Sequence, residues 1–305
     1  MKKTKQIENN AKIVNKYLNS KLKGNPKKLY DAAGHLIVNG GKRLRPYMVI
    51  RSCQILGGKS SNAMIAASAV EMVHNFTLVH DDIMDKAPLR RGNATVHEKW
   101  NNNVAILSGD TMIVKSYQLM TNVDSSIVKE VLNLFGQTAI KVCEGQQWDM
   151  DFETQSDVPL SDYMRMIEYK TAVLLAASLK IGGITAGANT EQQNHLYEFG
   201  RNLGIAFQLK DDLLDAFGSP DVFGKKVGGD ILANKKTFLY LKALQLADDS
   251  IKRKLQVYYT TNDKSELKVN GVKEIFKKYK LDQVVQAHED LEGRKILGPA
   301  VIIPN

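Results

Sequence analysis

The chain has 305 residues, of which 43% are hydrophobic and 25% are charged, so a large buried core is possible and general disorder is excluded. Its formal net charge of +9 is compatible with an acidic substrate, a nucleic acid, an anionic membrane surface or simply a lysine-rich surface. The cysteines, Cys53 and Cys143, form no metal-ligand or redox motif and have apolar neighbours, so we expect buried, reduced thiols.

The N-terminus and the most apolar stretch of the sequence bear on its location. The N-terminus is basic but lacks the apolar run that is typical of a signal peptide. The weakly polar stretch 171–188 is interrupted by Lys180 and by glycines, which favours a bent, buried helix over a membrane span. We therefore expect a soluble, cytoplasmic protein with no stable membrane insertion.

Helical periodicity dominates the chain, and prolines and glycines fall between the periodic segments. The predicted helices, in chain order, are 5–23, 27–38, 44–56, 60–82, 103–121, 125–148, 160–181, 190–217, 235–248, 250–260 and 271–291. Turns are predicted at 57–58, 92–93 and 218–220. Because no segment has the composition of an interdomain linker, these elements predict an all-α protein with a single domain spanning residues 1–305.

An acidic cluster, Asp81-Asp82-Ile83-Met84-Asp85, ends the helix predicted over 60–82. On a helix Asp81 and Asp85 share one face, and three carboxylates within one turn repel each other unless a cation lies among them. Carboxylate oxygens suit Mg²⁺, which keeps several waters and bridges to substrate phosphates. The run 67–79 before the cluster is largely apolar, which indicates that the carboxylates terminate a buried helix.

The same spacing recurs in Asp211-Asp212-Leu213-Leu214-Asp215, at the end of the apolar segment 199–217. One acidic triplet at a helix end is common, but two with identical spacing, each after core-like sequence, are hard to dismiss. If the two helices lie side by side, the clusters face each other across a cavity. Mg²⁺ ions bridging the clusters would then hold a diphosphate.

Basic residues accompany the first cluster. Arg90 and Arg91 follow it closely, and a guanidinium can donate two parallel hydrogen bonds to a phosphate. Upstream, the segment 40–46 (GGKRLRP) places three cations at the start of a helix, with Pro46 in the first turn. His74 lies two turns before the cluster on a similar face. Taken singly, these features are also compatible with a basic loop and a core histidine.

Together the motifs GGKRLRP, HDDIMD followed by LRRG, and FQLKDDLLD resemble the trans-isoprenyl diphosphate synthases, and they occur in the order typical of that family. The resemblance implies an all-α isoprenoid synthase fold around a deep central cavity and a homodimer. It also implies a Mg²⁺-dependent prenyltransferase that joins isopentenyl diphosphate head to tail with an allylic diphosphate (dimethylallyl, geranyl or farnesyl diphosphate).

The resemblance also implies roles for individual residues. The metal ligands, around three Mg²⁺ ions once substrates are bound, would be Asp81, Asp82, Asp85, Asp211, Asp212 and Asp215. The isopentenyl diphosphate would be held by Lys42, Arg45, His74 and Arg91, and the allylic diphosphate by Arg90, Lys225 and Lys235. Backbone oxygens of Lys170 and Thr171 and the side chain of Gln208 would stabilise the carbocation, and Gln146 and Asp149 would face the cavity. The departed diphosphate would accept the proton, so no protein base is nominated.

In this family the residues below the first cluster limit product length. Phe76 and Thr77 precede Asp81 by five and four residues, which places them roughly 6–7.5 Å beneath it on a helix. The bulky side chain of Phe76 predicts a product with a short prenyl chain. The absence of a two-residue insertion in the first cluster favours geranylgeranyl over farnesyl diphosphate as that product. A longer-chain polyprenyl diphosphate synthase stays an alternative.

Other classes fit the sequence less well. A terpene cyclase needs no second diphosphate site, a head-to-head condensing enzyme carries DxxxD-type clusters, and a non-catalytic subunit of a heteromeric synthase typically loses aspartates that are present here. No aromatic–basic motif indicates nucleic-acid binding. The C-terminus departs from the family pattern, because Pro299 and Pro304 interrupt the expected basic, amphipathic helix.

Overall fold

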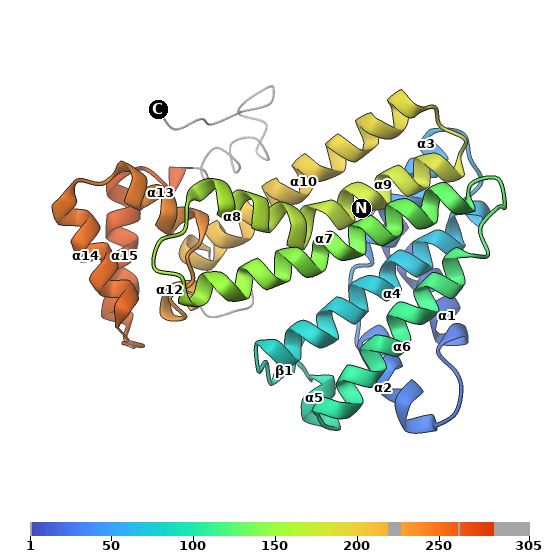
Figure 1. Ribbon diagram of the computed structural model, residues 1–305, viewed down its shortest axis with the longest axis horizontal. Helices are drawn as coiled ribbons and strands as arrows, with labels where there is room; N and C mark the ends of the chain where they lie inside the picture. Colours follow the sequence, from blue (N-terminus) through green and yellow to red (C-terminus); the bar gives the residue numbers. More distant parts are fainter. Residues whose placement is uncertain (1, 219–226, 262, 284–305) are drawn as a thin grey trace. The chain divides into compact units, whose positions relative to one another are not determined.

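The computed structural model describes residues 2–218, 227–261 and 263–283, and it is helical almost throughout these ranges (Figure 1). In the described ranges the only strands are β1 (Leu89–Arg90) and β2 (Asn93–Ala94), which pair antiparallel. The predicted all-α class is therefore confirmed. Lys225 and the proline-containing C-terminal segment lie outside the described residues, so the expectations for them have no structural counterpart.

Close contacts divide the chain into two compact units. Unit 1 comprises the residues up to 142 together with 172–203, and unit 2 comprises 143–171 with the described residues from 204 onward. The helices α7 (Val128–Thr154) and α10 (Thr190–Phe217) contribute to both units. The single domain expected over residues 1–305 stays a prediction.

Unit 1 is built around α4 (Ser60–Met84), a long helix that packs against α3, α6 and α9 (Figure 1). The other helices that lie wholly in this unit are α1 (Lys2–Lys21), α2 (Lys27–Val38), α3 (Leu44–Ile55), α5 (Val96–Lys99), α6 (Asn102–Met120) and α9 (Val173–Thr185). Along α4, small buried residues such as Ala63, Ala66 and Ala67 allow close approach on several sides. A helix that is apolar on most faces must be buried, and the first acidic cluster lies at the C-terminal end of α4.

Unit 2 contains α8 (Leu160–Ile167), all but the last residue of the π-helical turn η1 (Glu168–Ala172), α12 (Gly229–Leu232), α13 (Phe238–Leu246), α14 (Asp249–Thr260) and α15 (Glu266–Lys278). Its core includes Tyr163, Leu213, Tyr240 and Phe276, which come from four different helices. Residues with side-chain oxygens start its last helices: Asp248 accepts from the backbone N–H groups of Ser250 and Ile251 at α14. The second acidic cluster lies on the part of α10 that belongs to this unit.

Several predicted boundaries were wrong. The helix predicted over 160–181 is interrupted by η1, whose wider turn leaves no mark on hydrophobic periodicity. The helix predicted from 271 begins at Glu266, because Ser265 caps it by accepting from the backbone N–H of Lys268. The short α5 and α12 and the two strands were not predicted. Cys53 is buried as expected, but Cys143 is exposed, next to the exposed Glu144 on α7.

The helices also bear on the expected absence of membrane insertion. Among residues 2–218, 227–261 and 263–283, no helix combines the length and the apolar character that a membrane crossing requires.

Candidate functional site

The first acidic cluster lies where α4 ends. Asp85 follows the last helical residue and is exposed, whereas Asp82 is buried with 1% of its surface exposed. Arg90 on β1 reaches Asp82 with two nitrogens: its Nε lies 2.8 Å and its Nη2 2.7 Å from Asp82 Oδ1. Burial raises the pKa of Asp82, and the charge and hydrogen bond of Arg90 oppose that rise. The cluster is therefore split between an inward, arginine-bound carboxylate and an outward one.

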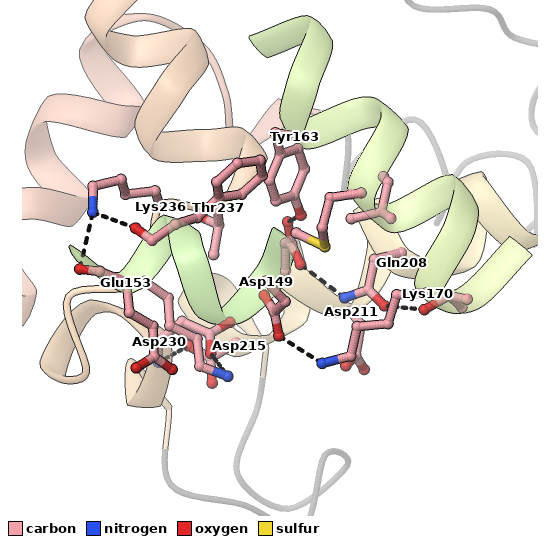
Figure 2. Close-up of a pocket in the computed structure, with 16 residues that line it drawn as sticks. Asp149, Glu153, Tyr163, Lys170, Gln208, Asp211, Asp215, Asp230, Lys236 and Thr237 are labelled. Atoms are coloured by element: carbon pink, nitrogen blue, oxygen red, sulfur yellow. Dashed lines mark hydrogen bonds and ion pairs between the residues drawn. The ribbon is translucent and has the colours of Figure 1, made fainter. Parts of the chain in front are cut away.

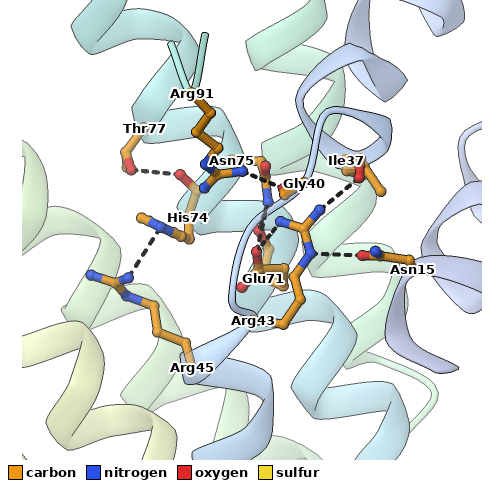
Figure 3. Close-up of polar contacts among 10 residues, drawn as sticks. All are labelled: Asn15, Ile37, Gly40, Arg43, Arg45, Glu71, His74, Asn75, Thr77 and Arg91. Carbon is orange, nitrogen blue, oxygen red and sulfur yellow. Dashed lines mark hydrogen bonds and ion pairs between the residues drawn. The ribbon is translucent and has the colours of Figure 1, made fainter. Parts of the chain in front are cut away.

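The segment between α2 and α3 is clamped from two sides by arginines (Figure 3). Buried Arg43 donates to Asn15 Oδ1 at 2.6 Å, to Glu71 Oε1 at 2.7 Å and to the carbonyl oxygen of Ile37 at 2.7 Å. Arg91 donates to the carbonyl oxygen of Gly40. A guanidinium can only donate, and each of the three nitrogens of Arg43 donates to an acceptor within the protein, so Arg43 holds the loop in place. Arg43, which was not among the residues predicted to bind a diphosphate, is thus the cation of this segment that holds the loop.

Arg45 and His74 form a pair beside this loop. Arg45 Nη1 lies 3.0 Å from His74 Nε2, and because a guanidinium can only donate, Nε2 accepts and His74 is neutral. Burial lowers the pKa of His74 well below its usual range, and the charges of Arg45, Arg91, Arg43 and Arg90 lower it further. The Nε of Arg45 is buried without a hydrogen-bond partner. The predicted residues Arg45, His74 and Arg91 are thus brought together in unit 1.

Positive charge is concentrated around this pair. Burial lowers the pKa of Arg91, and the charges of Arg43 and Arg90 lower it further, with Glu71 opposing them. Lys42, in the same segment as Arg45, has an exposed side chain. Mutually repelling cations with an unpartnered donor suit a polyvalent anion such as a diphosphate.

Phe76 is buried on α4, with its ring 4.8 Å from that of His80 in an edge-to-face arrangement. His80 in turn lies over Gly109 of α6, where any side-chain carbon would collide with the imidazole, and its Nε2 is 3.2 Å from the carbonyl oxygen of Ile106. Thr77 points its hydroxyl back to the carbonyl oxygen of His74 at 2.9 Å. The Phe76 ring is therefore fixed by a neighbour one turn closer to the acidic cluster.

The second acidic cluster lines a cavity of about 220 Å³ that lies wholly within unit 2 (Figure 2). Six carboxylates and three lysines line it: Asp149, Glu153, Asp211, Asp212, Asp215, Asp230, Lys170, Lys235 and Lys236. Asp212 is buried, and it accepts from the Tyr163 hydroxyl, from Gln208 Nε2 at 3.1 Å and from the backbone N–H of Phe238 at 3.2 Å. Like Asp82 in the first cluster, the middle aspartate is turned inward.

The residues predicted to face a carbocation lie along this cavity. Lys170 and Thr171 belong to η1, and π turns within α-helices occur frequently at functional sites. Lys170 Nζ lies 2.5 Å from Asp149 Oδ2, and the Thr171 hydroxyl donates to Gln208 Oε1 at 3.2 Å. Gln208, Asp211 and Thr171 thus line one cavity, and the roles that the resemblance implies for them stay predictions.

Asp230 is a cavity residue that the sequence reasoning missed. Its backbone N–H donates to Asp215 Oδ2 at 2.9 Å, and Lys235 Nζ lies 3.9 Å from its Oδ1. Burial raises the pKa of Asp230 to about 6, and the charges of Asp215, Asp212 and Asp211 contribute to that rise while Lys235 opposes it. Tyr163 was missed as well. The glycine pair before Asp230 was the available signal, whereas nothing local distinguishes Tyr163 from a core tyrosine.

The two neighbouring lysines of this segment have different partners. Lys236 Nζ donates to the carbonyl oxygens of Phe152 at 2.6 Å and Glu153 at 3.3 Å, and so caps the C-terminal turn of α7. Lys235, which the sequence predicted as a phosphate contact, has about half of its side chain exposed. Both lysines line the cavity, but Lys236 is held by the end of α7, whereas Lys235 lies beside Asp230.

A cation fits the chemistry of these donors. In the described ranges no three His, Cys, Asp or Glu side chains are already arranged around a metal position. Carboxylates nevertheless outnumber lysines in the unit 2 cavity, and the charges of Asp215, Asp212 and Asp211 add to the effect of burial in raising the pKa of Asp230. Oxygen donors of this kind suit Mg²⁺.

Comparison with known proteins places the chain. The family model for polyprenyl synthetase matches residues 26–278. A geranylgeranyl diphosphate synthase of Sulfolobus acidocaldarius is 40% identical over 273 residues, covering 88% of this chain and 83% of the relative. A geranylfarnesyl diphosphate synthase of Natronomonas pharaonis is 37% identical over 256 residues, covering 78% and 75%. The crystal structure of a geranylgeranyl pyrophosphate synthetase from Pyrococcus horikoshii superimposes with a TM-score of 0.88 at 35% identity, covering 97% and 93%.

The chain belongs to the polyprenyl synthetase family. The predicted resemblance to trans-isoprenyl diphosphate synthases, and with it the prediction of a prenyltransferase enzyme, is confirmed.

Proposed function

We propose that this protein is a short-chain trans-prenyltransferase that joins isopentenyl diphosphate to an allylic diphosphate and releases geranylgeranyl diphosphate. Family membership carries the reaction class, and relatives of similar length bear the name geranylgeranyl diphosphate synthase. Two acidic clusters, each with one inward and two flanking aspartates, support a catalytic chain over a non-catalytic subunit.

The two units would bind diphosphate in different ways. In unit 1 the isopentenyl diphosphate would lie against Lys42, Arg45, His74 and Arg91, since this group has excess positive charge and an unpartnered donor. Arginine and lysine alone can hold that anion. The allylic diphosphate would instead need Mg²⁺, because the cavity with Asp211 carries excess negative charge.

Asp81 and Asp85 in unit 1, and Asp211 in unit 2, would be the principal ligands of Mg²⁺, with three ions expected once substrates are bound. Bound Mg²⁺ supplies charge neutralisation for a leaving diphosphate. Asp82, Asp212 and Asp215 would support these ligands from behind, in keeping with the buried positions of Asp82 and Asp212. Arg90 and Lys235 would contact the allylic diphosphate, and Lys225 would do the same from outside the described residues.

Backbone and side-chain oxygens of the protein would then stabilise the allylic carbocation. The backbone oxygens of Lys170 and Thr171 and the amide oxygen of Gln208 would face the positive carbon, which fixed dipoles stabilise without reorganisation. The double bond of isopentenyl diphosphate attacks that carbon, and the proton lost in forming the new double bond passes to the departed diphosphate. A cavity closed to water would prevent hydrolysis of the cation.

Phe76 supports a short product. Its ring is buried and braced by His80, so it cannot swing aside without losing that contact. The geranylfarnesyl diphosphate synthase among the relatives keeps a longer product as the second candidate. Replacement of Phe76 with alanine should lengthen the product when isopentenyl diphosphate is in excess. An unchanged chain length would remove Phe76 as the limit.

A homodimer in the cytoplasm is part of the same proposal. Ile106, Leu107 and Val114 expose apolar side chains along α6, a pattern that a second copy of the chain would cover. Both cysteines are free, as is usual in a reducing compartment.

The test is elongation of labelled isopentenyl diphosphate with dimethylallyl, geranyl or farnesyl diphosphate, each with Mg²⁺ and with a chelator. We expect a twenty-carbon product that requires both an allylic primer and Mg²⁺. The absence of elongation with every primer would contradict the proposed reaction.

A further inference from the structure

The helix α7 and the π turn η1 approach each other closely at Gly145. A side-chain carbon at this position would lie 2.8 Å from Lys170 Cα and 2.8 Å from the carbonyl carbon of Tyr169, and closer still to the Lys170 backbone nitrogen. Non-bonded carbon atoms prefer separations of about 3.5–4.0 Å. The atoms in the way are backbone, which has no rotamer to escape into. Any residue other than glycine must therefore push η1 away from α7.

A second contact joins the same two elements one helical turn further along α7. Asp149 Oδ2 lies 2.5 Å from Lys170 Nζ, with both side chains about one third exposed or less. Residues four apart share a helix face, so Gly145 and Asp149 present one surface to η1. One residue supplies the space for close approach, and the other supplies the charge.

The docked turn carries the groups on which the unit 2 cavity depends. Thr171 donates to Gln208, and Gln208 donates to Asp212 of the second acidic cluster. A π turn is a local departure from the regular helix, so its carbonyl directions depend on what fixes it. A shift of η1 would move the oxygens of Lys170 and Thr171 and disturb Gln208 together.

We propose that Gly145 and Asp149 are positioning residues that dock η1 on α7 and so aim the Lys170 and Thr171 carbonyl oxygens into the cavity. This inference rests on the proposed function of the cavity. Neither residue needs to touch the reacting carbon: Gly145 acts through the backbone of Lys170, and Asp149 acts through its ammonium group.

The matched experiment compares Gly145→Ala with Gly136→Ala, the same substitution nine residues earlier on α7. At Gly136 a side-chain carbon meets only the Tyr117 hydroxyl at 3.4 Å, so alanine fits. We expect Gly145→Ala to lower kcat about 100-fold, because misplacing a catalytic group by about 1 Å has that effect. The KM for isopentenyl diphosphate should stay within about twofold of the wild-type value, since its proposed contacts lie in unit 1. Gly136→Ala should leave both constants unchanged.

Circular dichroism and thermal melts supply the folded fraction by which kcat is normalised. A kcat for folded Gly145→Ala within about twofold of the Gly136→Ala control would overturn the inference. Should Gly145→Ala fail to fold, Asp149→Asn decides, because it keeps the volume and removes only the charge that meets Lys170. It should lower kcat about tenfold with an unchanged KM for isopentenyl diphosphate, and a wild-type kcat would overturn the inference. Failure of the proposed function is distinct, because the wild-type enzyme would then show no elongation at all.

Discussion

The two acidic clusters have the same spacing but different surroundings. In each, the middle aspartate is buried, with 1% of Asp82 and 5% of Asp212 exposed. Asp82 is bound by a cation, Arg90, and one of its oxygens has no hydrogen-bond partner. Asp212 is bound by neutral donors, including the Tyr163 hydroxyl and the Gln208 amide. The two clusters thus share a spacing, but the middle aspartate has a charged partner in one and neutral partners in the other.

The difference teaches that spacing identifies the ligands while the neighbours decide the charge of the site. In unit 1, burial lowers the pKa of His74, and the charges of four nearby arginines lower it further. Around the second cluster, carboxylates outnumber lysines, and their charges help to raise the pKa of Asp230. The group of Arg45, His74 and Arg91 in unit 1 is therefore suited to an anion without metal, and the cavity of unit 2 to an anion that arrives with metal.

The largest expected effect follows from removing one outward aspartate from each cluster. Asp81→Asn and Asp211→Asn should each lower kcat/KM by at least about 10³-fold, because a metal contributes several kcal/mol of charge stabilisation in the transition state. Initial rates with labelled isopentenyl diphosphate at saturating Mg²⁺ measure the loss. Retention of about a tenth of wild-type activity by either variant would show that its cluster is not a principal metal site.

A smaller loss is expected from the donor behind the second cluster. Tyr163→Phe removes the hydroxyl that binds Asp212, and hydrogen bonds to charged groups are worth about 1.5–3 kcal/mol, so kcat should fall roughly 10- to 100-fold. Tyr259→Phe is the control, since that hydroxyl is buried in the same core without a hydrogen-bond partner. Equal activity of the two variants would mean that Asp212 needs no support from Tyr163.

In the first cluster, loss of the buried aspartate should lower the stability of the fold. Asp82→Asn removes the charge that faces Arg90 and should lower the free energy of unfolding by about 1–3 kcal/mol, the cost of leaving a charged group without its partner. Denaturant titration measures the change, and exposed Asp85→Asn is the control with no expected loss. If Asp82→Asn is as stable as Asp85→Asn, the Arg90 contact contributes nothing to folding.

The smallest expected effect is on the pH dependence of stability, and it comes from His74, the partner of Arg45. The folded-state pKa of His74 is lowered, so the unfolded chain binds a proton near its usual pKa of 6.5 while the folded chain does not. His74 therefore supports the fold above pH 6.5, and its contribution is lost as the pH falls below that value, by at most about 1.4 kcal/mol per pH unit. Melting curves of His74→Gln should show a weaker loss between about pH 7 and 5 than the wild type.

If His74→Gln keeps the wild-type pH dependence of stability, His74 is protonated in the folded chain, and its role as an acceptor from Arg45 is wrong.

Much of the fold could be read from the sequence because most helices bury one strongly apolar face. The long α4 and α10 were predicted to within two residues at either end, since each stops at an acidic cluster. The π turn could not be predicted, because a π turn leaves no mark on hydrophobic periodicity, and its close contact with Gly145 is a tertiary one. The start of α13 likewise depends on a distant partner, since the backbone N–H of Phe238 donates to Asp212.

The candidate site was predictable where a motif is contiguous. Asp211 and Gln208 lie in one motif, and Lys170 and Thr171 in another, and the resemblance to the family implied that the two motifs serve one site. Asp230 and Tyr163 join the cavity from separate helices, and only the fold brings them to it. The different partners of Lys235 and Lys236 likewise could not be predicted from the sequence, because Lys236 contacts the end of α7.

The contrast between an arginine-bound and a metal-bound diphosphate is tested most directly by calorimetric titration with and without Mg²⁺. The ligands are isopentenyl diphosphate and a thio analogue of geranyl diphosphate whose carbon–sulfur bond does not ionise. Isopentenyl diphosphate should bind with nearly the same Kd in chelator as in Mg²⁺, whereas the allylic analogue should bind only with Mg²⁺. Equal dependence of both ligands on Mg²⁺ would contradict the assignment of different charge to the two sites.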